Sequence, residues 1–396
     1  MKDLRDIIDR NRAWFCMDCG KCSAVCPITH FETRAYSSPR LLVEKALAGD
    51  SDAVLADPLF WSCLSCKRCS ELCPSDVFFS EFIRDARHLA RQRHQSGPCT
   101  HGEVIQTWAR LMADPDLSQD RLGWLNGDLA VSQDSDTVYF TGCLPYYDVL
   151  FSHLKFDGIA VARATVRILN AMGIRPQVLA DERCCGHDQL WEGDRETFRA
   201  LARLNLAMLE KTGARRIVTS CPECARTLAI DYSAQMGGHD FEVLHITQLA
   251  ARKAADGQLK LKPYPDAPRV TYQDPCRLGR HLGVYDAPRA LLDQAGCLLE
   301  EMPDTQKSAQ CCGTSCWTAC GQVSKAIQSQ RLKQARETGA GTLVTACIKC
   351  QIHFKCAQQD TALQEAIGID IRDISTLLAE RIRDAHATAD DGRGSV

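Results

Sequence analysis

Cys143, Cys184-Cys185-Gly186 and Cys221-Pro222-Glu223-Cys224 recur later in the chain as Cys276, Cys311-Cys312-Gly313 and Cys347-Ile348-Lys349-Cys350. The flanking sequence repeats as well, since residues 213–220 match 339–346 and residues 246–250 match 374–378. Self-similarity at a fixed spacing is the signature of a duplicated structural unit. We therefore predict two units of related fold, at residues 134–255 and 268–384.

Short apolar runs alternate with longer helical patterns inside each unit. In the first unit, strands are predicted at residues 138–140, 177–179 and 217–218, and a helix through Phe198 to Met208. This alternation favours an α/β fold with parallel strands. Ligands of such sheets bind beyond the carboxyl ends of the strands, where the cysteine groups lie. One pocket per unit is therefore expected to collect five thiolates.

The N-terminal region carries a second duplicated pattern, Cys16-x2-Cys19-x2-Cys22-x3-Cys26-Pro27 and Cys63-x2-Cys66-x2-Cys69-x3-Cys73-Pro74. This spacing is typical of ferredoxins with two [4Fe–4S] clusters, in which the fourth cysteine of each run ligates the other cluster. The prediction is one cluster held by Cys16, Cys19, Cys22 and Cys73, and another held by Cys63, Cys66, Cys69 and Cys26. Helices are expected at 39–48 and from residue 79 onward, so this ferredoxin-like domain, residues 1–95, is predicted to be mostly helical. Residues 96–133 are predicted to be a linker and residues 385–396 a flexible tail.

Composition narrows the class of protein. The chain has 396 residues, 23 cysteines and a net charge of −3, so no basic surface indicates nucleic-acid binding. The first residues lack the apolar segment of a secretory signal, and no apolar stretch is long enough to cross a bilayer. We expect a cytoplasmic protein that does not itself span a membrane, with any membrane contact made through a partner. In a reducing compartment these cysteines are expected to bind metal.

Two alternatives for the cysteines are less favoured. Structural zinc sites do not require two complete ferredoxin runs that each end in Cys-Pro. Vicinal disulfides at the Cys-Cys pairs explain neither the remote Cys143 and Cys276 nor the paired Cys-x2-Cys groups. The glycine after each Cys-Cys pair allows close approach of the backbone to a large cofactor.

The chain resembles the catalytic subunits of heterodisulfide reductases, in the form that fuses a ferredoxin-like domain to two Cys-Cys-Gly domains. Besides the cysteines, the resemblance rests on Trp61-Ser62-Cys63, Ser38-Pro39-Arg40, Ser220-Cys221-Pro222 and residues 274–281, Asp-Pro-Cys-Arg-Leu-Gly-Arg-His. It covers roughly residues 13–380. The iron–sulfur subunits of anaerobic glycerol-3-phosphate dehydrogenase and of lactate utilisation are related to this family.

The resemblance implies that each five-cysteine set binds a noncubane [4Fe–4S] cluster, and that two such clusters reduce a disulfide held between them. The predicted catalytic residues are those of the second set, Cys276, Cys311, Cys312, Cys347 and Cys350. The chain departs from the family beside this set. Residues 314–320, Thr-Ser-Cys-Trp-Thr-Ala-Cys, replace a glycine run, and Arg277 replaces a histidine.

Other side chains near the ligands have open roles. Cys297 is expected in the core, whereas Cys316 and Cys320, expected on one helix face, and Cys356 either pack or take part in redox chemistry. A second group either hydrogen-bonds near the clusters or donates protons: His187, His281 and His353. A third group either pairs with a carboxylate of the substrate or offsets cluster charge: Arg34, Arg40, Arg277 and Arg280. Trp191 and Trp317 are expected to shield clusters from water.

Two functions are compatible with these patterns. In the first, an oxidoreductase subunit receives electrons at two cubane clusters and reduces a disulfide at two noncubane clusters. In the second, an adaptor relays electrons between a flavoprotein or dehydrogenase and a quinone-linked or larger reductase complex. The chain has no Gly-x-Gly-x-x-Gly segment after a strand, so the electron donor is expected to be another protein.

Overall fold

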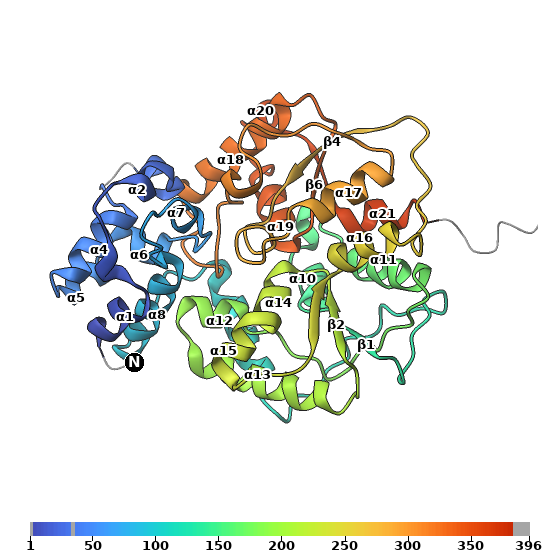
Figure 1. Cartoon of the computed structure of the whole chain (residues 1–396), viewed down its shortest axis with the longest axis horizontal. Coiled ribbons are helices and arrows are strands. Elements are labelled where there is room, and N and C mark those ends of the chain that lie inside the picture. The colour runs from blue at the N-terminus through green and yellow to red at the C-terminus, as the bar shows by residue number, and fades with distance from the viewer. Residues whose placement is uncertain (1–2, 33–35, 383–396) are drawn as a thin grey trace, which may run out of the picture.

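The structure is a computed structural model that describes residues 3–32 and 36–382. A helical N-terminal domain lies beside two α/β units (Figure 1). No helix within the described ranges is long and apolar enough to cross a membrane. The predicted tail at 385–396 and Arg34 lie outside the described residues.

Short helices build the N-terminal domain, and the loops between them carry the two cysteine runs. Ser38 caps one of them by accepting a hydrogen bond from the Leu41 amide, with Pro39 at the first helical position. The helices are α1 (Leu4–Arg10), α2 (Lys21–Val25), α3 (Pro27–Phe31), α4 (Pro39–Leu47), α5 (Ser51–Leu55), α6 (Pro58–Ser62), α7 (Arg68–Glu71) and α8 (Phe79–Gln92). The predicted helical character of this region is confirmed.

The first α/β unit contains a three-stranded parallel sheet of order β1-β2-β3. Its strands are β1 (Thr137–Tyr139), β2 (Arg216–Thr219) and β3 (Glu242–His245). Its helices are α10 (Leu144–Leu150), α11 (Gly158–Ala171), α12 (His187–Glu192), α13 (Arg195–Glu210), α14 (Pro222–Arg226), α15 (Ser233–Met236) and α16 (Ile246–Ala255). A π-helical segment, Thr227–Tyr232, joins α14 to α15.

The second unit repeats this plan with a four-stranded parallel sheet of order β5-β4-β6-β7. Its strands are β4 (Arg269–Gln273), β5 (Leu298–Leu299), β6 (Thr342–Thr345) and β7 (Asp370–Asp373). Its helices are α17 (Asp286–Gln294), α18 (Gln322–Glu337), α19 (Ile348–Ala357), α20 (Gln364–Ile367) and α21 (Ile374–Ala379). The predicted parallel α/β fold is confirmed in both units.

Helices from the two units pack together between the sheets. In Figure 1, α11 and α16 of the first unit lie against α17 and α21 of the second. The segments that follow β2 and β4 both contact the N-terminal domain, since Arg226 pairs with Glu81 and Arg277 donates to the Ser65 carbonyl oxygen. One apolar cluster joins that domain to the second unit, because Phe60, Phe82 and Ile83 belong to the same buried group as Cys311, Cys312 and Ile327. The N-terminal domain is therefore anchored beside the second cysteine set.

Two local predictions need correction. Residues 177–179 do not form a strand, since only Gln177 pairs, in an isolated bridge to Val138. The chain leaves β1 directly after Gln177, whose N–H and carbonyl oxygen bond to Thr137 and Tyr139. Cys316 and Cys320 do not share a helix, because Cys316, Trp317 and Ala319 have left-handed backbone with φ of 55°, 54° and 52°. The predicted linker also contains a helix, α9 (Val104–Met112).

Candidate functional site

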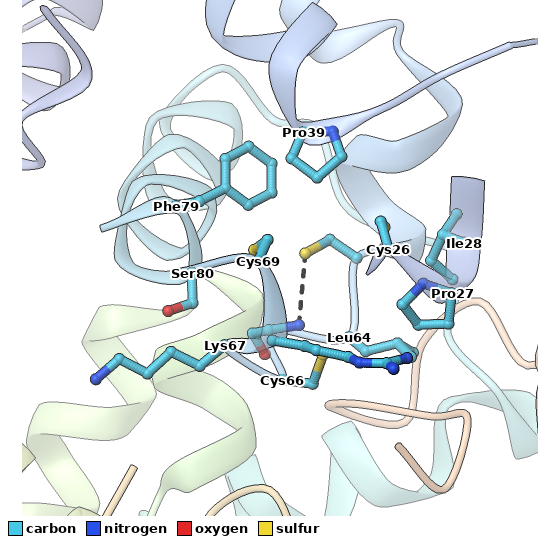
Figure 2. Close-up of a pocket in the computed structure, with 13 residues that line it drawn as sticks. Cys26, Pro27, Ile28, Pro39, Leu64, Cys66, Lys67, Cys69, Phe79 and Ser80 are labelled. Carbon is cyan, nitrogen blue, oxygen red and sulfur yellow. Dashed lines mark hydrogen bonds between the residues drawn. The ribbon is translucent and has the colours of Figure 1, made fainter. Parts of the chain in front are cut away.

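The second ferredoxin run and Cys26 surround one small cavity of about 360 Å³. Cys26, Cys63, Cys66 and Cys69 line it, and Pro39 and Phe79 close its far side (Figure 2). Burial raises the pKa of Cys26 to about 11 and that of Cys63 to about 12. Thiols buried together in this way are hard to deprotonate on their own. A bound metal cation would stabilise their thiolate forms. The fourth cysteine here comes from the first run, as the predicted exchange requires.

The first ferredoxin run lies nearer the surface. Burial, with a smaller contribution from the neighbouring Cys16 and Cys73 thiols, raises the pKa of Cys22. Cys73 is near enough to act on Cys22 and does not line the cavity of the second run, which is compatible with the reciprocal half of the exchange. Cys19 is exposed.

All five cysteines of the first α/β unit line one cavity of about 280 Å³: Cys143, Cys184, Cys185, Cys221 and Cys224. Cys143 follows β1, Cys221 follows β2, and the Cys184-Cys185 pair lies in the loop before α12. The Sγ atoms of Cys143 and Cys184 are 3.7 Å apart. Hydrogen bonds from the Cys143 and Cys185 thiols hold the pKa of Cys184 well below its usual value.

The second unit repeats this arrangement around a cavity of about 330 Å³ lined by Cys276, Cys312, Cys347 and Cys350. Cys311 completes the set, since its thiol interacts with those of Cys276 and Cys312. Hydrogen bonds from the Cys311 and Cys350 thiols lower the pKa of Cys312 well below its usual value. The Nδ1 atom of His353 lies 3.3 Å from the Cys312 Sγ.

The glycine of each Cys-Cys-Gly group is required by the backbone and by close packing. Gly186 and Gly313 have φ of 81° and 87°. A Cβ at Gly186 would lie 2.8 Å from the Phe198 ring, and one at Gly313 would lie 2.8 Å from the Ser324 carbonyl oxygen. Any other residue would push the paired cysteines out of the cavity.

The chemistry of these four groups fits iron–sulfur clusters. Their donors are thiols only, three of the four groups line a cavity of their own, and none of the described cysteines forms a disulfide. Thiolates are the usual ligands of [4Fe–4S] clusters. Zinc sites need only four donors, which five convergent thiols exceed.

The ferredoxin-like and α/β cysteine sets meet at Cys66. The Cys311 thiol donates a hydrogen bond that lowers the pKa of Cys66 to about 5. The same Cys311 thiol lowers the pKa of Cys276. Cys66 and the second α/β set are therefore in direct contact, which gives the dicluster domain a short connection to that set.

The two α/β cavities share a wall made of Glu223 and Lys349. The Lys349 Nζ lies 2.8 Å from the Glu223 Oε2 and 2.5 Å from the Asp188 Oδ1. Although burial alone would lower it, these two carboxylates hold the pKa of Lys349 well above its usual value. The His187, Asp188 and Glu223 side chains are close enough to bind a metal ion, but the Lys349 ammonium already supplies the cation.

Arg277 and His187 lie beside this wall. The Arg277 Nε donates to the His187 Nε2 at 3.1 Å, and the His187 Nδ1 is 2.8 Å from the Thr227 hydroxyl. Burial, and then the charges of Arg277 and Lys349, lower the pKa of His187 well below its usual value. His187 is therefore a neutral ring whose Nε2 accepts and whose Nδ1 donates.

Two tryptophans enclose the same region, and both are fully buried, as expected of shielding residues. The Arg277 guanidinium lies 4.1 Å from the centre of the Trp191 ring. The Lys349 Nζ lies 5.2 Å from the centre of the Trp317 ring. Cys316, just before Trp317, is fully buried, and its charge interactions with Lys349 and Asp188 place its thiol beside the shared wall. The left-handed backbone of Cys316, Trp317 and Ala319 is the conformation that glycines adopt without strain.

The remaining predicted residues lie outside this wall. Arg40 pairs with Asp18 on the surface, and Cys297 is buried in the core as expected. The Cys356 Sγ lies 3.0 Å from the Lys325 Nζ. Cys320 and Cys99 line an open groove between the N-terminal domain and α18.

His281 and Arg280 contact the second ferredoxin run. The His281 Nε2 lies 3.0 Å from the Ser65 carbonyl oxygen, and the Arg280 Nε donates to the Cys66 carbonyl oxygen at 2.6 Å. Neither makes an ion pair with a carboxylate in the described part of the chain.

Sequence reasoning did not single out Asp188, Glu223, Lys349 or Arg87. Glu223 and Lys349 do carry a signal, because they occupy equivalent positions of the duplicated Cys-x2-Cys group with opposite charges. Opposite charges at one position of a repeat favour contact between the two copies. Asp188 and Arg87 carry no comparable signal.

Models of known protein families match the N-terminal domain and both α/β units. Residues 13–77 match the 4Fe-4S dicluster domain, and residues 137–229 and 270–355 match the cysteine-rich domain named for its Cys-Cys-Gly sequence. The dicluster match supports two cubane clusters, and the other two matches imply further iron–sulfur clusters.

The chain is also similar to individual iron–sulfur and redox proteins. The chain is 35% identical over 272 residues to a subunit of the dihydromethanophenazine:CoB–CoM heterodisulfide reductase of Methanosarcina barkeri, covering 67% of the chain and 63% of the relative. It is 27% identical over 390 residues to a subunit of the CoM/CoB fumarate reductase of Methanothermobacter marburgensis, covering 94% and 73%. It is 33% identical over 203 residues to the EtfAB:quinone oxidoreductase of Syntrophomonas wolfei, covering 49% and 27%. The chain thus spans slightly less than two thirds of the heterodisulfide reductase polypeptide.

Proposed function

This chain belongs to the family of iron–sulfur proteins that join a 4Fe-4S dicluster domain to two cysteine-rich domains, and we propose that it reduces a disulfide between its two five-cysteine sets. The same family includes the heterodisulfide reductase polypeptide of Methanosarcina barkeri. The observation that carries this proposal is the shared wall of Glu223 and Lys349. The two cavities, one for each set, lie on either side of this wall. A disulfide bound across the wall would have one sulfur toward each set.

The proposed ligands are the eighteen cysteines of the four sets. When bound, the clusters supply electrons one at a time, so two facing clusters together provide the pair that one disulfide needs. The overall reaction is R–S–S–R′ plus two electrons and two protons, giving RSH and R′SH. Cys66, in contact with Cys311, connects the dicluster domain to the second set.

The surrounding residues favour the charge that forms in this reaction. Cleavage of a disulfide produces thiolates, and Arg277, which makes no ion pair with a carboxylate among the described residues, lines the cavity of the second set together with Lys349. Trp191 and Trp317 exclude water, which strengthens these interactions. The donor of the electrons is a partner protein, as is usual for subunits of this type.

The test is an anaerobic assay of the iron- and sulfide-loaded chain with reduced methyl viologen as donor. Glutathione disulfide and bis(2-hydroxyethyl) disulfide serve as probes. We expect disulfide-dependent oxidation of the viologen that is lost in Cys312→Ala and in Cys185→Ala. Cys297→Ala, which changes a buried cysteine of the core, is the matched control and should keep the activity.

A spectroscopic measurement separates this function from the adaptor function. A paramagnetic species that forms only when 2-mercaptoethanol is added under oxidising conditions indicates a thiol bound at a five-cysteine set. Its absence, together with no turnover of either disulfide but normal viologen reduction of the dicluster domain, would favour an electron relay. In that case the substrate belongs to a partner.

A further inference from the structure

Three buried arginines converge on the loop of the second ferredoxin run. Arg87 of α8 donates to the carbonyl oxygens of Phe60, Trp61 and Cys63 at 2.9–3.2 Å. Its remaining nitrogen donates to the Trp191 carbonyl oxygen at 3.1 Å. The guanidinium is thus satisfied by carbonyl oxygens alone, and Arg87 is only 1% exposed.

The other two arginines come from the loop after Cys276. Arg277 donates to the Ser65 carbonyl oxygen at 2.8 Å and to the Ser65 hydroxyl at 2.9 Å. Arg280 donates to the Cys66 carbonyl oxygen at 2.6 Å and to the Ala309 carbonyl oxygen at 2.7 Å. Both are buried. Residues 60–66 therefore accept hydrogen bonds from three positively charged guanidinium groups.

None of these three arginines pairs with a carboxylate among residues 3–32 and 36–382. Of the five other buried arginines in the described part of the chain, three pair with a carboxylate, as Arg121 does with Glu182 and Arg195 with Asp85, whereas Arg183 and Arg331 do not. Hydrogen bonds to carbonyl oxygens satisfy the N–H groups but do not neutralise a charge. A buried charge without a counter-charge is costly, so a counter-charge is expected nearby.

The cavity of Cys26, Cys63, Cys66 and Cys69 is the place where such a counter-charge fits. Four thiolates and an iron–sulfur core carry net negative charge, and one-electron reduction adds another negative charge. The first ferredoxin run lacks this environment, because its nearby Arg40 is paired with Asp18 at 2.7 Å on the surface. Burial disfavours added negative charge, so without the arginines the second site would be harder to reduce than the first.

We propose that Arg87, Arg277 and Arg280 raise the midpoint potential of the cluster held by Cys26, Cys63, Cys66 and Cys69 above that of the cluster held by Cys16, Cys19, Cys22 and Cys73. Electrons that enter at the exposed Cys19 side then collect at the cluster whose ligand Cys66 contacts Cys311. The arginines thereby set the direction of flow toward the second five-cysteine set. The inference rests on the proposed ligands but not on disulfide reduction.

The experiment is a redox titration of the full, cluster-loaded chain followed by electron paramagnetic resonance. The wild-type protein should show two dicluster midpoints. Cys19→Ser, which alters the exposed ligand of the first site, should change only the lower one. The opposite order of the two midpoints in the wild-type protein would overturn the proposal without any arginine variant.

The arginine variants test the cause of the order. Arg280→Gln and Arg87→Gln should each lower the second midpoint enough to change its reduced fraction about tenfold at fixed potential, which is about 59 mV for one electron. Arg280→Lys keeps the charge and should restore most of the shift. Arg91→Gln is the matched control on α8, because Arg91 is paired with Glu192, and it should leave both midpoints unchanged.

A purely structural role for the arginines gives different results. If Arg280→Lys shifts the midpoint as far as Arg280→Gln, or if both clusters shift equally, charge is not the cause and the proposal is wrong. Iron content and circular dichroism identify variants that fail to fold or lose the cluster. Loss of iron from the wild-type sites would instead contradict the proposed ligands, so the two failures are distinguishable.

Discussion

Glu223 and Lys349 occupy the same position of the duplicated Cys-x2-Cys group and meet across the two α/β units, with the Lys349 Nζ 2.8 Å from the Glu223 Oε2. Asp188 lies on the other side of the ammonium at 2.5 Å. The two copies of the repeat therefore carry side chains of opposite charge at the position where they contact each other. The resulting ion triad joins the two units at the wall between their cysteine sets.

Lys349→Met should destabilise the protein by about 3 kcal/mol, because it leaves two carboxylates without their buried partner. The midpoint of guanidinium-induced unfolding, measured anaerobically on the loaded chain, should fall accordingly. Lys355→Met on the same helix is the control, since Lys355 bonds only to the exposed Lys155 carbonyl oxygen. Adding Asp188→Asn and Glu223→Gln to Lys349→Met should recover much of the loss. No recovery would mean that packing of the lysine, not its charge, is what matters.

Stability should also fall in mild acid because of His245, which caps α16 and is fully buried. Burial lowers the pKa of His245 to about 4. Below pH ~6.5 the unfolded chain binds a proton at His245 that the folded chain does not take up until about pH 4. The free energy of unfolding should therefore decrease by up to about 3 kcal/mol over this window.

His245→Asn keeps a capping side chain but does not titrate, so it separates this effect from acid damage to the clusters. Urea unfolding of both proteins at pH 7 and pH 5 provides the measurement. The wild-type protein should lose more stability between these values than the variant does. Equal losses in the two proteins would assign the acid sensitivity to other groups.

Much of the fold follows from local sequence, but the contacts between units do not. The strands near Val138, Ile217 and Leu343 are predictable because short apolar runs end just before the cysteines. Residues 314–320 are compatible with a helix by sequence, because nothing local reveals the left-handed backbone at Cys316, Trp317 and Ala319. That backbone is set by tertiary contacts, including the hydrogen bond from the Gln106 Nε2 to the Cys316 carbonyl oxygen.

The candidate site divides in the same way. The grouping of the cysteines can be predicted from their spacing, because most ligands of each set lie close together in sequence on short loops. The three arginines around residues 60–66 come from segments more than twenty residues away or from another unit, so only the folded chain brings them together. Glu223 and Lys349 have opposite charges at equivalent positions of the repeat. Their contact is therefore the one contact between the two units that the sequence could have predicted.

Exchange of the fourth ligands gives a direct test of the dicluster domain. Cys73→Ala should abolish the signal of the cluster held by Cys16, Cys19 and Cys22, because Cys73 is near enough to act on the pKa of Cys22 and does not line the cavity of the second run. Cys26→Ala should abolish the other signal. Electron paramagnetic resonance of each dithionite-reduced variant distinguishes them. If Cys73→Ala removes only the cluster of Cys63, Cys66 and Cys69, the exchange is wrong.

The last prediction compares two buried cysteines beside the proposed reaction space. Cys312 belongs to the second set and contacts His353, whereas Cys316 lies at the shared wall with its Sγ 3.3 Å from the Ser315 hydroxyl. Burial raises the pKa of Cys316 to about 12, and Cys316 does not line either five-cysteine cavity, so we expect it to pack beside the second set as a neutral thiol.

Cys312→Ala should therefore abolish viologen-driven reduction of glutathione disulfide while the dicluster domain still becomes reduced. Cys316→Ser keeps the size and a hydroxyl in place of the thiol, and we expect a loss of rate of less than about tenfold, which corresponds to about 1.4 kcal/mol in the barrier. Measuring both rates with iron content per chain checks this order. If Cys316→Ser is as inactive as Cys312→Ala with full iron content, the Cys316 thiol takes part in the chemistry. If Cys312→Ala keeps full turnover, the second set is not where the disulfide reacts.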